Sequence, residues 1–331
     1  MTEKENSIKL DKRDKRLIHI LGENSRMPLT EIGKHLRLHP DTARYKLQRL
    51  FELGVVCKNT AELDFIRLGY SIYQVFMLVD TDTEEEYTNF ITMLSQHPNT
   101  KEVRTYHDRW DVEWVVVARN LQEFDEFFWE FTAKSKARIL HKNHLSVVEY
   151  LRTTNVAHSL FPNETVKIEQ QKSSQSLSLD STDRALLQVL AKDARTAATS
   201  IAAEIGVSVD SVIRRIKKLY SDGVITKFSI VLDRAKIGHD WYVFAVRCNS
   251  LAKNIQSSLR EFVRTHPHIF RCVKVHGSWD FLFYISTDSR EEFHKTIREI
   301  KTILSAHLTD YDTWIIYDEI QQQHIPKTIT D

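Results

Sequence analysis

The chain has 331 residues, of which 46 are basic and 45 acidic. This length favours about two domains, and the near-zero net charge excludes a protein that attracts nucleic acid or membranes through bulk charge alone. No stretch approaches the roughly 18 apolar residues of a membrane helix, and the polar N-terminal segment predicts no secretory signal. The three widely spaced cysteines argue against a disulfide scaffold or a cysteine zinc site and favour a reducing cytoplasm.

The sequence repeats itself once, at an offset of 169 positions and without a gap. Between residues 10 and 69, 16 of 60 positions are identical to their counterparts, where average composition predicts about three or four. The register continues to the paired motifs His97-Pro98 and His266-Pro267, and Trp110-Asp111 and Trp279-Asp280. Because this period is too long for a solenoid, we interpret it as a whole folding unit copied once.

The start of each copy has the pattern of a winged helix-turn-helix. In the second copy, apolar spacing predicts helices over residues 180–191, 198–205 and 209–221. Gly206 can end the second helix in the left-handed conformation, and Ser208 can cap the third. After Gly223, residues 224–225 and 228–232 predict a two-stranded hairpin, the wing. Helix, short turn and helix form the helix-turn-helix signature.

The rest of each copy has the pattern β-α-β-β-α-β, which is the ferredoxin-like split βαβ unit. The predicted strands are 71–79, 101–107, 112–118 and 139–151 in the first copy, and 241–248, 269–276, 280–286 and 307–317 in the second, with helices over 251–265 and 289–303. Two helices cover one face of such a sheet, so its other apolar face needs a second sheet, which the other copy can supply.

The predicted fold class is therefore α+β, with two copies of a winged helix-turn-helix followed by a ferredoxin-like βαββαβ domain. The domains are winged helix-turn-helix modules at 8–66 and 177–235, ferredoxin-like effector and oligomerisation domains at 67–155 and 236–325, and a linker at 156–176. The polar residues between 163 and 178 cannot bury enough apolar surface to order themselves, so we expect them to be flexible.

Several segments of the second copy carry a resemblance to a known family. They are Leu179-Asp180-Ser181-Thr182-Asp183-Arg184, Asp193-Ala194-Arg195, residues 208–219, Asp222-Gly223-Val224-Ile225 and Gly277-Ser278-Trp279-Asp280. In these the chain resembles the Lrp/AsnC (feast/famine) transcriptional regulators, whose second domain is of the RAM type. Most members have one copy and dimerise, so the resemblance implies a covalently joined pseudo-dimer that forms homo-oligomers, binds double-stranded DNA, and is a cytoplasmic regulator rather than an enzyme, with no cofactor and no membrane contact.

The third helix of each copy would then enter the major groove. The predicted DNA-binding residues are Ser208, Asp210, Ser211, Arg214, Arg215, Lys217 and Lys218 in the second copy, and Thr42, Arg44, Tyr45, Lys46 and Arg49 in the first. In the second copy four cations against one anion suit phosphate neutralisation and guanine readout; the alternative is an ordinary solvated helix face. Because Tyr45 stands where Arg214 stands, the two copies predict an asymmetric operator.

In single-copy relatives the hairpin between the second and third strands lines a small-molecule site, often for an amino acid. The resemblance assigns this role to His276, Gly277, Ser278, Trp279 and Asp280, and to His107, Arg109, Trp110 and Asp111. Gly277 lets backbone N–H groups approach a carboxylate, and Asp280 could hold an ammonium group. In the first copy Asp108 replaces the glycine and disfavours a carboxylate, although Arg109 could compensate. The alternative is a tight hairpin whose Trp packs on the sheet and whose Asp fixes the turn.

Other functions compete with this interpretation. Sirohaem decarboxylases share the two-module architecture and use His and Arg around a tetrapyrrole, and residues 105–109 offer His107 and Arg109. A protein that binds DNA through charge alone is a third possibility. His141 and His144 lie three apart on a predicted strand and so on opposite faces, which predicts no metal site. The sequence has no phosphate-binding loop, nucleophile elbow or zinc-protease motif.

Overall fold

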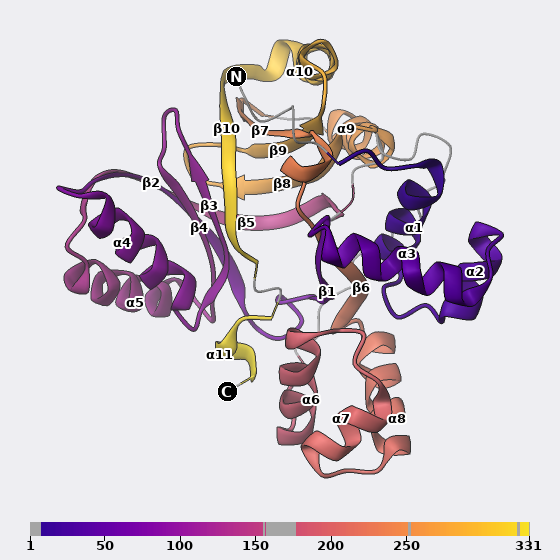
Figure 1. Ribbon diagram of the computed structural model, residues 1–331. Coiled ribbons are helices and arrows are strands. Elements are labelled where there is room, and N and C mark those ends of the chain that lie inside the picture. Colours follow the sequence, from indigo (N-terminus) through magenta and orange to yellow (C-terminus); the bar gives the residue numbers. More distant parts are fainter. Residues whose placement is uncertain (1–7, 155, 157–176, 251–252, 323–324, 331) are drawn as a thin grey trace.

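The two copies fold into the same succession of elements (Figure 1). The computed structural model describes residues 8–154, 156, 177–250, 253–322 and 325–330, so most of the predicted flexible linker lies outside the described residues. No helix in these ranges is long and apolar enough to cross a membrane.

Each copy begins with three helices. Module one consists of α1 (Lys12–Glu23), α2 (Leu29–Leu36) and α3 (Pro40–Glu52), and module two of α6 (Ser181–Lys192), α7 (Ala198–Ile205) and α8 (Val209–Ser221). The predicted bounds hold to within one residue in module two because the local signals are strong. Gly206 ends α7 in the left-handed conformation with a φ of 71°, and the Ser208 hydroxyl accepts the Ser211 N–H at 3.2 Å.

The predicted wing hairpin is wrong. Each module is followed by one unbroken strand, β1 (Val56–Leu63) or β6 (Ile225–Leu232), and the two strands pair with each other in antiparallel fashion. Residues 226 and 227, which the prediction left between two short strands, continue β6 because the other copy supplies the hydrogen-bonding partner. Thr60 lies opposite Ser229, its own counterpart in the repeat, so a pseudo-twofold axis passes between them.

Each of these two strands also packs into the hydrophobic core of the other copy's helical module. Ala61 and Leu63 of β1 pack in the core of module two, with Leu186 among its residues. Ile230 and Leu232 of β6 pack in the core of module one. Figure 1 shows the β1–β6 ribbon between the two helical modules. Neither module completes its apolar core with residues of its own copy, so the modules are tied to each other through the ribbon.

The remaining strands and helices form two ferredoxin-like units. Unit one contains β2 (Ser71–Asp80), α4 (Glu84–Gln96), β3 (Thr100–Tyr106), β4 (Val112–Ala118), α5 (Leu121–Lys134) and β5 (Arg138–Thr153). Unit two contains β7 (Asp240–Cys248), α9 (Lys253–Thr265), β8 (Ile269–His276), β9 (Phe281–Thr287), α10 (Arg290–Leu304) and β10 (Leu308–Gln322). A short helix, α11 (Lys327–Thr330), follows.

The two four-stranded sheets close into one barrel, in the order β10-β3-β4-β2-β5-β8-β9-β7. Closure depends on the long last strands. The first half of β5 pairs with β2 and its second half with β8, while β10 pairs first with β7 and then with β3. Each unit therefore donates the end of its last strand to the other unit, a joining of the sheets that the repeat did not reveal.

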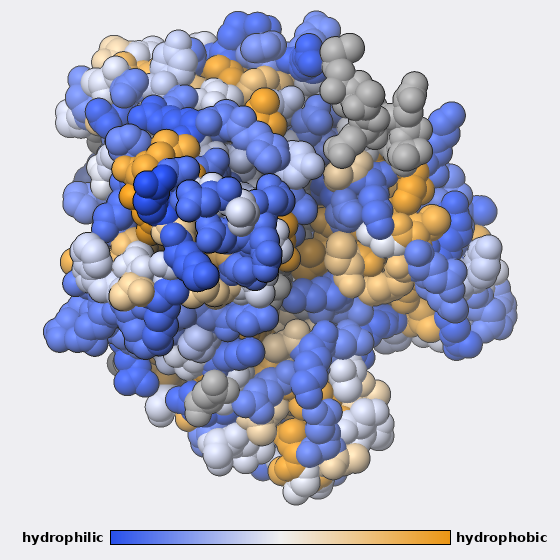
Figure 2. Space-filling model, turned by 60° about the vertical axis from the view of Figure 1, so that its left-hand side comes forward, coloured by the Kyte–Doolittle hydropathy of each residue, from blue (hydrophilic) through white to orange (hydrophobic). Residues whose placement is uncertain are grey.

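The barrel has an inner core and two outer cores. Phe76, Trp279 and Trp314 pack inside it, whereas α4 and α5 cover the outside of unit one and α9 and α10 the outside of unit two. The surface is mainly hydrophilic in the view of Figure 2, with apolar side chains in separate patches.

Candidate nucleic-acid interface

Helix α8 has an apolar face and a cationic face. Val212 and Leu219 are buried in module two, while Arg214, Lys217 and Lys218 are exposed and make no ion pair within the described part of the chain. Three further predicted residues lie at the start of this helix: Ser208 caps it, Ser211 is half-buried and donates its N–H to that cap, and Asp210 is exposed in the first turn. A row of free cations on one helix face can contact a polyanion.

Arg215 lies on a different side of α8 from these cations. Its Nη1 donates to the carboxylates of Asp180 at 2.7 Å and Asp183 at 2.6 Å. The same two aspartates form the capping box of α6, and the Asp183 backbone N–H together with Arg215 lowers the pKa of Asp180. The sequence predicted that Arg215 binds DNA with its neighbours on α8, but in the structure its ion pairs to Asp180 and Asp183 fasten α8 to α6.

Helix α3 repeats this arrangement with a different outer face. Lys46 Nζ lies 2.8 Å from the carboxylates of both Asp11 and Asp14, and Arg49 Nη1 lies 3.3 Å from Asp14. Three predicted residues stay exposed on α3, namely Thr42, Arg44 and Tyr45. Arg44 is 3.6 Å from Asp41 in the first turn of the same helix. Lys46 is therefore engaged within module one, as Arg215 is within module two.

Two arginines that the DNA-binding prediction did not include hold the modules together. Arg26 Nη1 donates to the backbone carbonyls of Ala194 at 2.5 Å and Thr196 at 3.0 Å. Arg195, its counterpart in the repeat, donates to the carbonyls of Ser25 and Met27. Burial lowers the pKa of both guanidinium groups. The signal that could have identified them is their identity at equivalent positions just after the first helix.

The two hairpins predicted to bind an effector are tightly built. Trp110 and Trp279 are buried in the inner core. Asp111 accepts the Val79 N–H at 2.7 Å, and Asp280 accepts the Cys248 N–H at 2.8 Å. These contacts are those of the alternative that the sequence left open, in which Trp packs on the sheet and Asp fixes the turn.

The other hairpin residues face the opposite unit. His107 packs against Tyr317 of β10 with ring centroids 4.0 Å apart, and Arg109 Nη1 lies 2.6 Å from Asp312 of the same strand. In the second hairpin the Ser278 hydroxyl is 2.7 Å from Asn143 Oδ1 of β5, and His276 and Gly277 are exposed. Each hairpin thus closes against the last strand of the other copy.

A pocket of about 400 Å³ lies beside the second hairpin. Its lining residues are Cys248, Asn249, Ser250, Gln256, Lys274, Asp280 and Phe281. Lys274 and Asp280 bring opposite charges to one small cavity, which suits a zwitterion. The first copy has Thr105 in place of Lys274, so the pair is confined to the second copy. Lys274 was not among the predicted residues, although it lies only two residues before His276.

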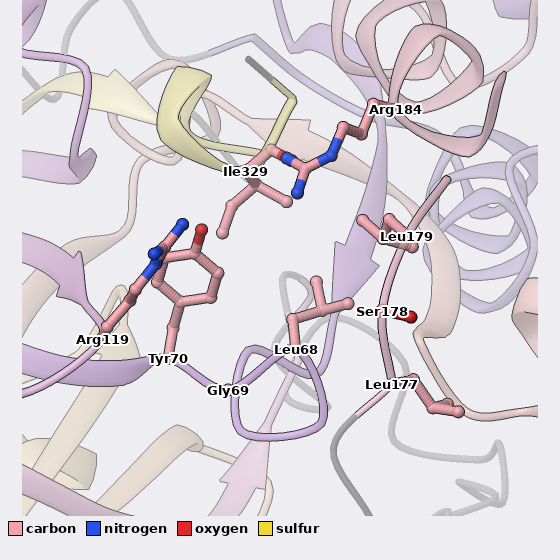
Figure 3. A pocket seen from close by; sticks show the side chains of 9 residues that line it. All are labelled: Leu68, Gly69, Tyr70, Arg119, Leu177, Ser178, Leu179, Arg184 and Ile329. Atoms are coloured by element: carbon pink, nitrogen blue, oxygen red, sulfur yellow. The ribbon is translucent and has the colours of Figure 1, made fainter. Parts of the chain in front are cut away.

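A second pocket, of about 380 Å³, lies between unit one, module two and the C-terminal helix (Figure 3). Figure 3 shows Arg119 beside the Tyr70 ring and Arg184 reaching toward Ile329 from the other side. Tyr70 donates its hydroxyl to the Thr328 carbonyl at 3.2 Å, and Arg184 donates to the Ile329 carbonyl at 2.8 Å. These bonds hold α11 in place as one wall of the pocket.

The histidines do not gather with other metal ligands in the described residues, where no group of three or more His, Cys, Asp and Glu side chains could hold a metal ion. His144 packs edge-on against Phe124 and Phe128, and burial lowers its pKa. His141 is exposed.

Across nearly its whole length the chain is similar to a solved enzyme. The crystal structure of the siroheme decarboxylase NirDL superposes with a TM-score of 0.61, covers 96% of each chain and is 11% identical in sequence. This likeness shows a shared fold. The prediction that the chain is not an enzyme is therefore contradicted, because an enzyme has the same fold over nearly the whole chain.

The sequence comparisons point to regulators. The AsnC-type helix-turn-helix domain matches residues 10–50 and 179–220. A proline dehydrogenase transcriptional activator of Rhodobacter capsulatus is 27% identical over 150 residues, which are 45% of this chain and 96% of that protein. The HTH-type transcriptional regulator FL11 of Pyrococcus horikoshii is 32% identical over 120 residues, which are 36% of this chain and 78% of that protein. With two such domains, each followed by a ferredoxin-like unit, the chain belongs to the Lrp/AsnC family of DNA-binding transcriptional regulators.

Proposed function

We propose that the chain is a sequence-specific DNA-binding regulator in which two unlike helix-turn-helix modules, joined as a pseudo-dimer, read two different half-sites. The outer face of α8 supports this most directly. Arg214, Lys217 and Lys218 are exposed there, opposite the buried Val212 and Leu219. On a chain whose net charge is +1, such a local row of cations suits phosphate contacts, and a guanidinium suits bidentate pairing to guanine.

The two modules offer different chemistry to DNA. Tyr45 and Gln48 of α3 occupy the positions that Arg214 and Lys217 occupy in α8, and Arg49, the counterpart of Lys218, lies beside Asp14. A phenol and an amide do not read the base pattern that a guanidinium and an ammonium read. The operator is therefore an imperfect palindrome, with half-sites about one helical turn, roughly 34 Å, apart.

Selection of binding sites from random DNA tests the proposal. We expect one preferred pair of unlike half-sites, and an optimum of two identical inverted half-sites would contradict it. Arg214→Ala should weaken specific binding by about tenfold to a hundredfold, as expected for loss of one bidentate base contact worth about 1–3 kcal/mol. Lys218→Ala should reduce the slope of affinity against salt by about one phosphate contact. Lys134→Ala on α5, an exposed lysine beside Glu130, is the matched control and should leave both quantities unchanged.

We infer that an amino acid modulates this binding from the pocket beside the second hairpin. Lys274 faces its carboxylate and Asp280 its ammonium group, and the hairpin borders the last strand of unit one. Occupancy would bias the spacing of the modules or the assembly of chains into larger homo-oligomers. A calorimetric screen of amino acids should find a ligand that Lys274→Ala no longer binds. No heat and no thermal shift with any amino acid would remove the effector.

A tetrapyrrole enzyme of the siroheme decarboxylase kind is the second candidate. The whole-chain fold favours it, and the hairpin of unit one carries His107 and Arg109, which contact Tyr317 and Asp312 of β10. Addition of a sirohaem analogue should produce a shifted Soret band that His107→Ala alters if this function holds. An unshifted band, together with salt-dependent retardation of DNA, would decide for the regulator.

A further inference from the structure

A buried ion pair joins two positions that are equivalent in the repeat. Glu102 on β3 and Arg271 on β8 are separated by the repeat offset of 169. Arg271 Nη1 lies 2.6 Å from Glu102 Oε2, and Nη2 lies 3.3 Å from Oε1. Arg271 is 5% exposed and Glu102 1% exposed, and Glu102 also forms ion pairs with Lys101 and Arg104 of its own unit. A residue that contacts its own counterpart in a twofold arrangement lies on the axis, so this pair lies on the pseudo-twofold axis of the barrel.

Because the pair lies on the axis, its charges favour one pairing of the ferredoxin-like units over the others. If unit one paired with another unit one, Glu102 would face a second Glu102. If unit two paired with another unit two, Arg271 would face a second Arg271. Two buried Arg271 guanidinium groups would be strongly unfavourable, because each loses its hydration and gains no carboxylate on the axis. Each Glu102 would keep Lys101 and Arg104 of its own unit but would lose Arg271 and face a like charge. Only the pairing of unit one with unit two places opposite charges on the axis.

The barrel interior carries a second asymmetry, which Arg104 connects to the pair on the axis because it contacts both Glu102 and Glu113. Unit one contributes Gln74, Arg104, Tyr106 and Glu113, all buried, where unit two has Val243, Val273, Val275 and Leu282. Glu113 accepts hydrogen bonds from Arg104 at 3.0 Å and Tyr106 at 2.6 Å, both of unit one. Its third donor is the Tyr284 hydroxyl of unit two, at 2.8 Å.

Unit one cannot provide that third donor. The counterpart of Tyr284 in unit one is Val115, which has no hydroxyl. Two copies of unit one would therefore bring two Glu113 carboxylates into the interior, each short of a hydrogen bond, and an unsatisfied buried acceptor destabilises a fold. The interior thus disfavours pairing of two unit ones also through the missing hydrogen bond to Glu113.

We propose that these buried polar residues select the partner of each ferredoxin-like unit, so that unit one pairs with unit two, of the same chain or of a second copy, and not with its own kind. Specificity arises chiefly from the penalty on the wrong pairs. The inference rests on the proposed pseudo-dimer, but it concerns pairing alone and assigns these residues no part in reading DNA.

Thermal unfolding of the full chain tests the ion pair. Glu102→Gln removes the carboxylate that Arg271 shares with Lys101 and Arg104 and should lower the unfolding midpoint by roughly 5–10 °C. Adding Arg271→Gln should recover the part of that loss that comes from the buried Arg271 guanidinium. Glu149 and Arg260 form a half-exposed ion pair between the same two units, 2.6 Å apart, and the corresponding Gln variants should change the midpoint by no more than about 2 °C. No recovery in the double variant would overturn the role of the pair.

Exchange of partners tests the selection itself. A protease site placed within residues 164–176 lets the folded chain be cut into two pieces of different mass that remain together. After incubation in urea low enough to permit exchange, native mass spectrometry distinguishes like from unlike pairs. We expect unlike pairs from the wild-type sequence and at least tenfold more like pairs from Glu102→Gln/Arg271→Gln. Equal proportions in both would overturn the proposal. Since no DNA is present, that outcome would leave the proposed function standing.

Discussion

Arg26 and Arg195 each donate hydrogen bonds to the backbone carbonyls that flank the other. The two residues are counterparts in the repeat, so the exchange is reciprocal across the pseudo-twofold axis. A guanidinium has several donors in one plane and can bridge two carbonyls at once. The exchange fixes the turn after α1 against the turn after α6, and with it the position of α3 relative to α8.

Removal of either arginine should loosen this relation. Arg26→Ala leaves two carbonyls without their donor and should cost about 1.5–3 kcal/mol of unfolding free energy, the range for hydrogen bonds to charged groups. Operator affinity should fall as well, because the spacing of the modules is less fixed. Urea unfolding and DNA titration measure the two effects. Arg298→Ala on α10, an exposed arginine, is the control. Additive effects of Arg26→Ala and Arg195→Ala would show that the two arginines act independently.

Neighbouring arginines on α8 should have opposite effects when replaced. Arg215→Ala removes the ion pairs to Asp180 and Asp183, so module two should lose stability while the salt dependence of DNA binding by the folded protein stays the same. Arg214→Ala should leave stability within about 0.5 kcal/mol, as is usual for an exposed side chain, and should weaken binding. Unfolding curves and DNA titrations at several salt concentrations separate the two. A reduced salt slope for Arg215→Ala would place that residue on DNA after all.

Stability should fall on acidification through His97, which is half-buried, and His239, which is buried. Burial lowers the pKa of His97 and of His239 to about 4, below the ordinary value of 6.5. Between pH 6.5 and pH 4 these histidines therefore bind more protons in the unfolded chain than in the folded chain. The stability that the two neutral histidines contribute is complete above pH 6.5 and is lost as the pH falls toward 4. Urea midpoints measured between pH 7 and pH 4.5 should decrease. His97→Phe keeps an aromatic ring against Trp114 and Phe127 and should reduce the dependence of the urea midpoint on pH. An unchanged dependence would contradict the role of His97 in it.

Gly277 should tolerate no side chain. Its φ is 151°, and a Cβ there would lie 2.7 Å from Leu145 Cδ2 and 2.8 Å from the His144 carbonyl oxygen. Gly277→Ala should therefore push the second hairpin away from β5 and cost about 1–3 kcal/mol. Gly206→Ala is the matched control, because it also has a positive φ but meets nothing within 4 Å; it should cost about 1 kcal/mol. Equal losses in thermal unfolding would show that the close approach to β5 does not matter.

Local structure followed from the sequence because its signals are local. The helices of module two have apolar spacing, Ser208 as a cap and Gly206 as a stop, and the repeat identified two units of one fold. In each unit the predicted strands and helices also had ordinary lengths, so their order could be predicted. Such features depend on residues a few positions apart, so they can be recognised within one short stretch of sequence.

Long-range pairing could not be predicted in the same way. Residues 224–232 have the composition of a hairpin as well as of a single strand, and only the presence of β1 from the other copy decides between them. Arg215 and Lys46 looked like outward cations because the aspartates that hold them lie 32 and 35 residues earlier. Spacing along one helix cannot reveal a partner on another, so the face of a charged residue stays ambiguous until the helices are packed.

Closure of the eight strands has a consequence for how chains can associate. A barrel exposes no row of unpaired backbone N–H and C=O groups onto which a foreign strand could add. In the described residues the open strand edges are those of the β1–β6 ribbon, between the two DNA-reading modules. Larger assemblies that form through the barrel must therefore use side chains of the outer helices and hairpins, where single substitutions can tune them; in the described residues only the ribbon offers backbone edges for strand addition.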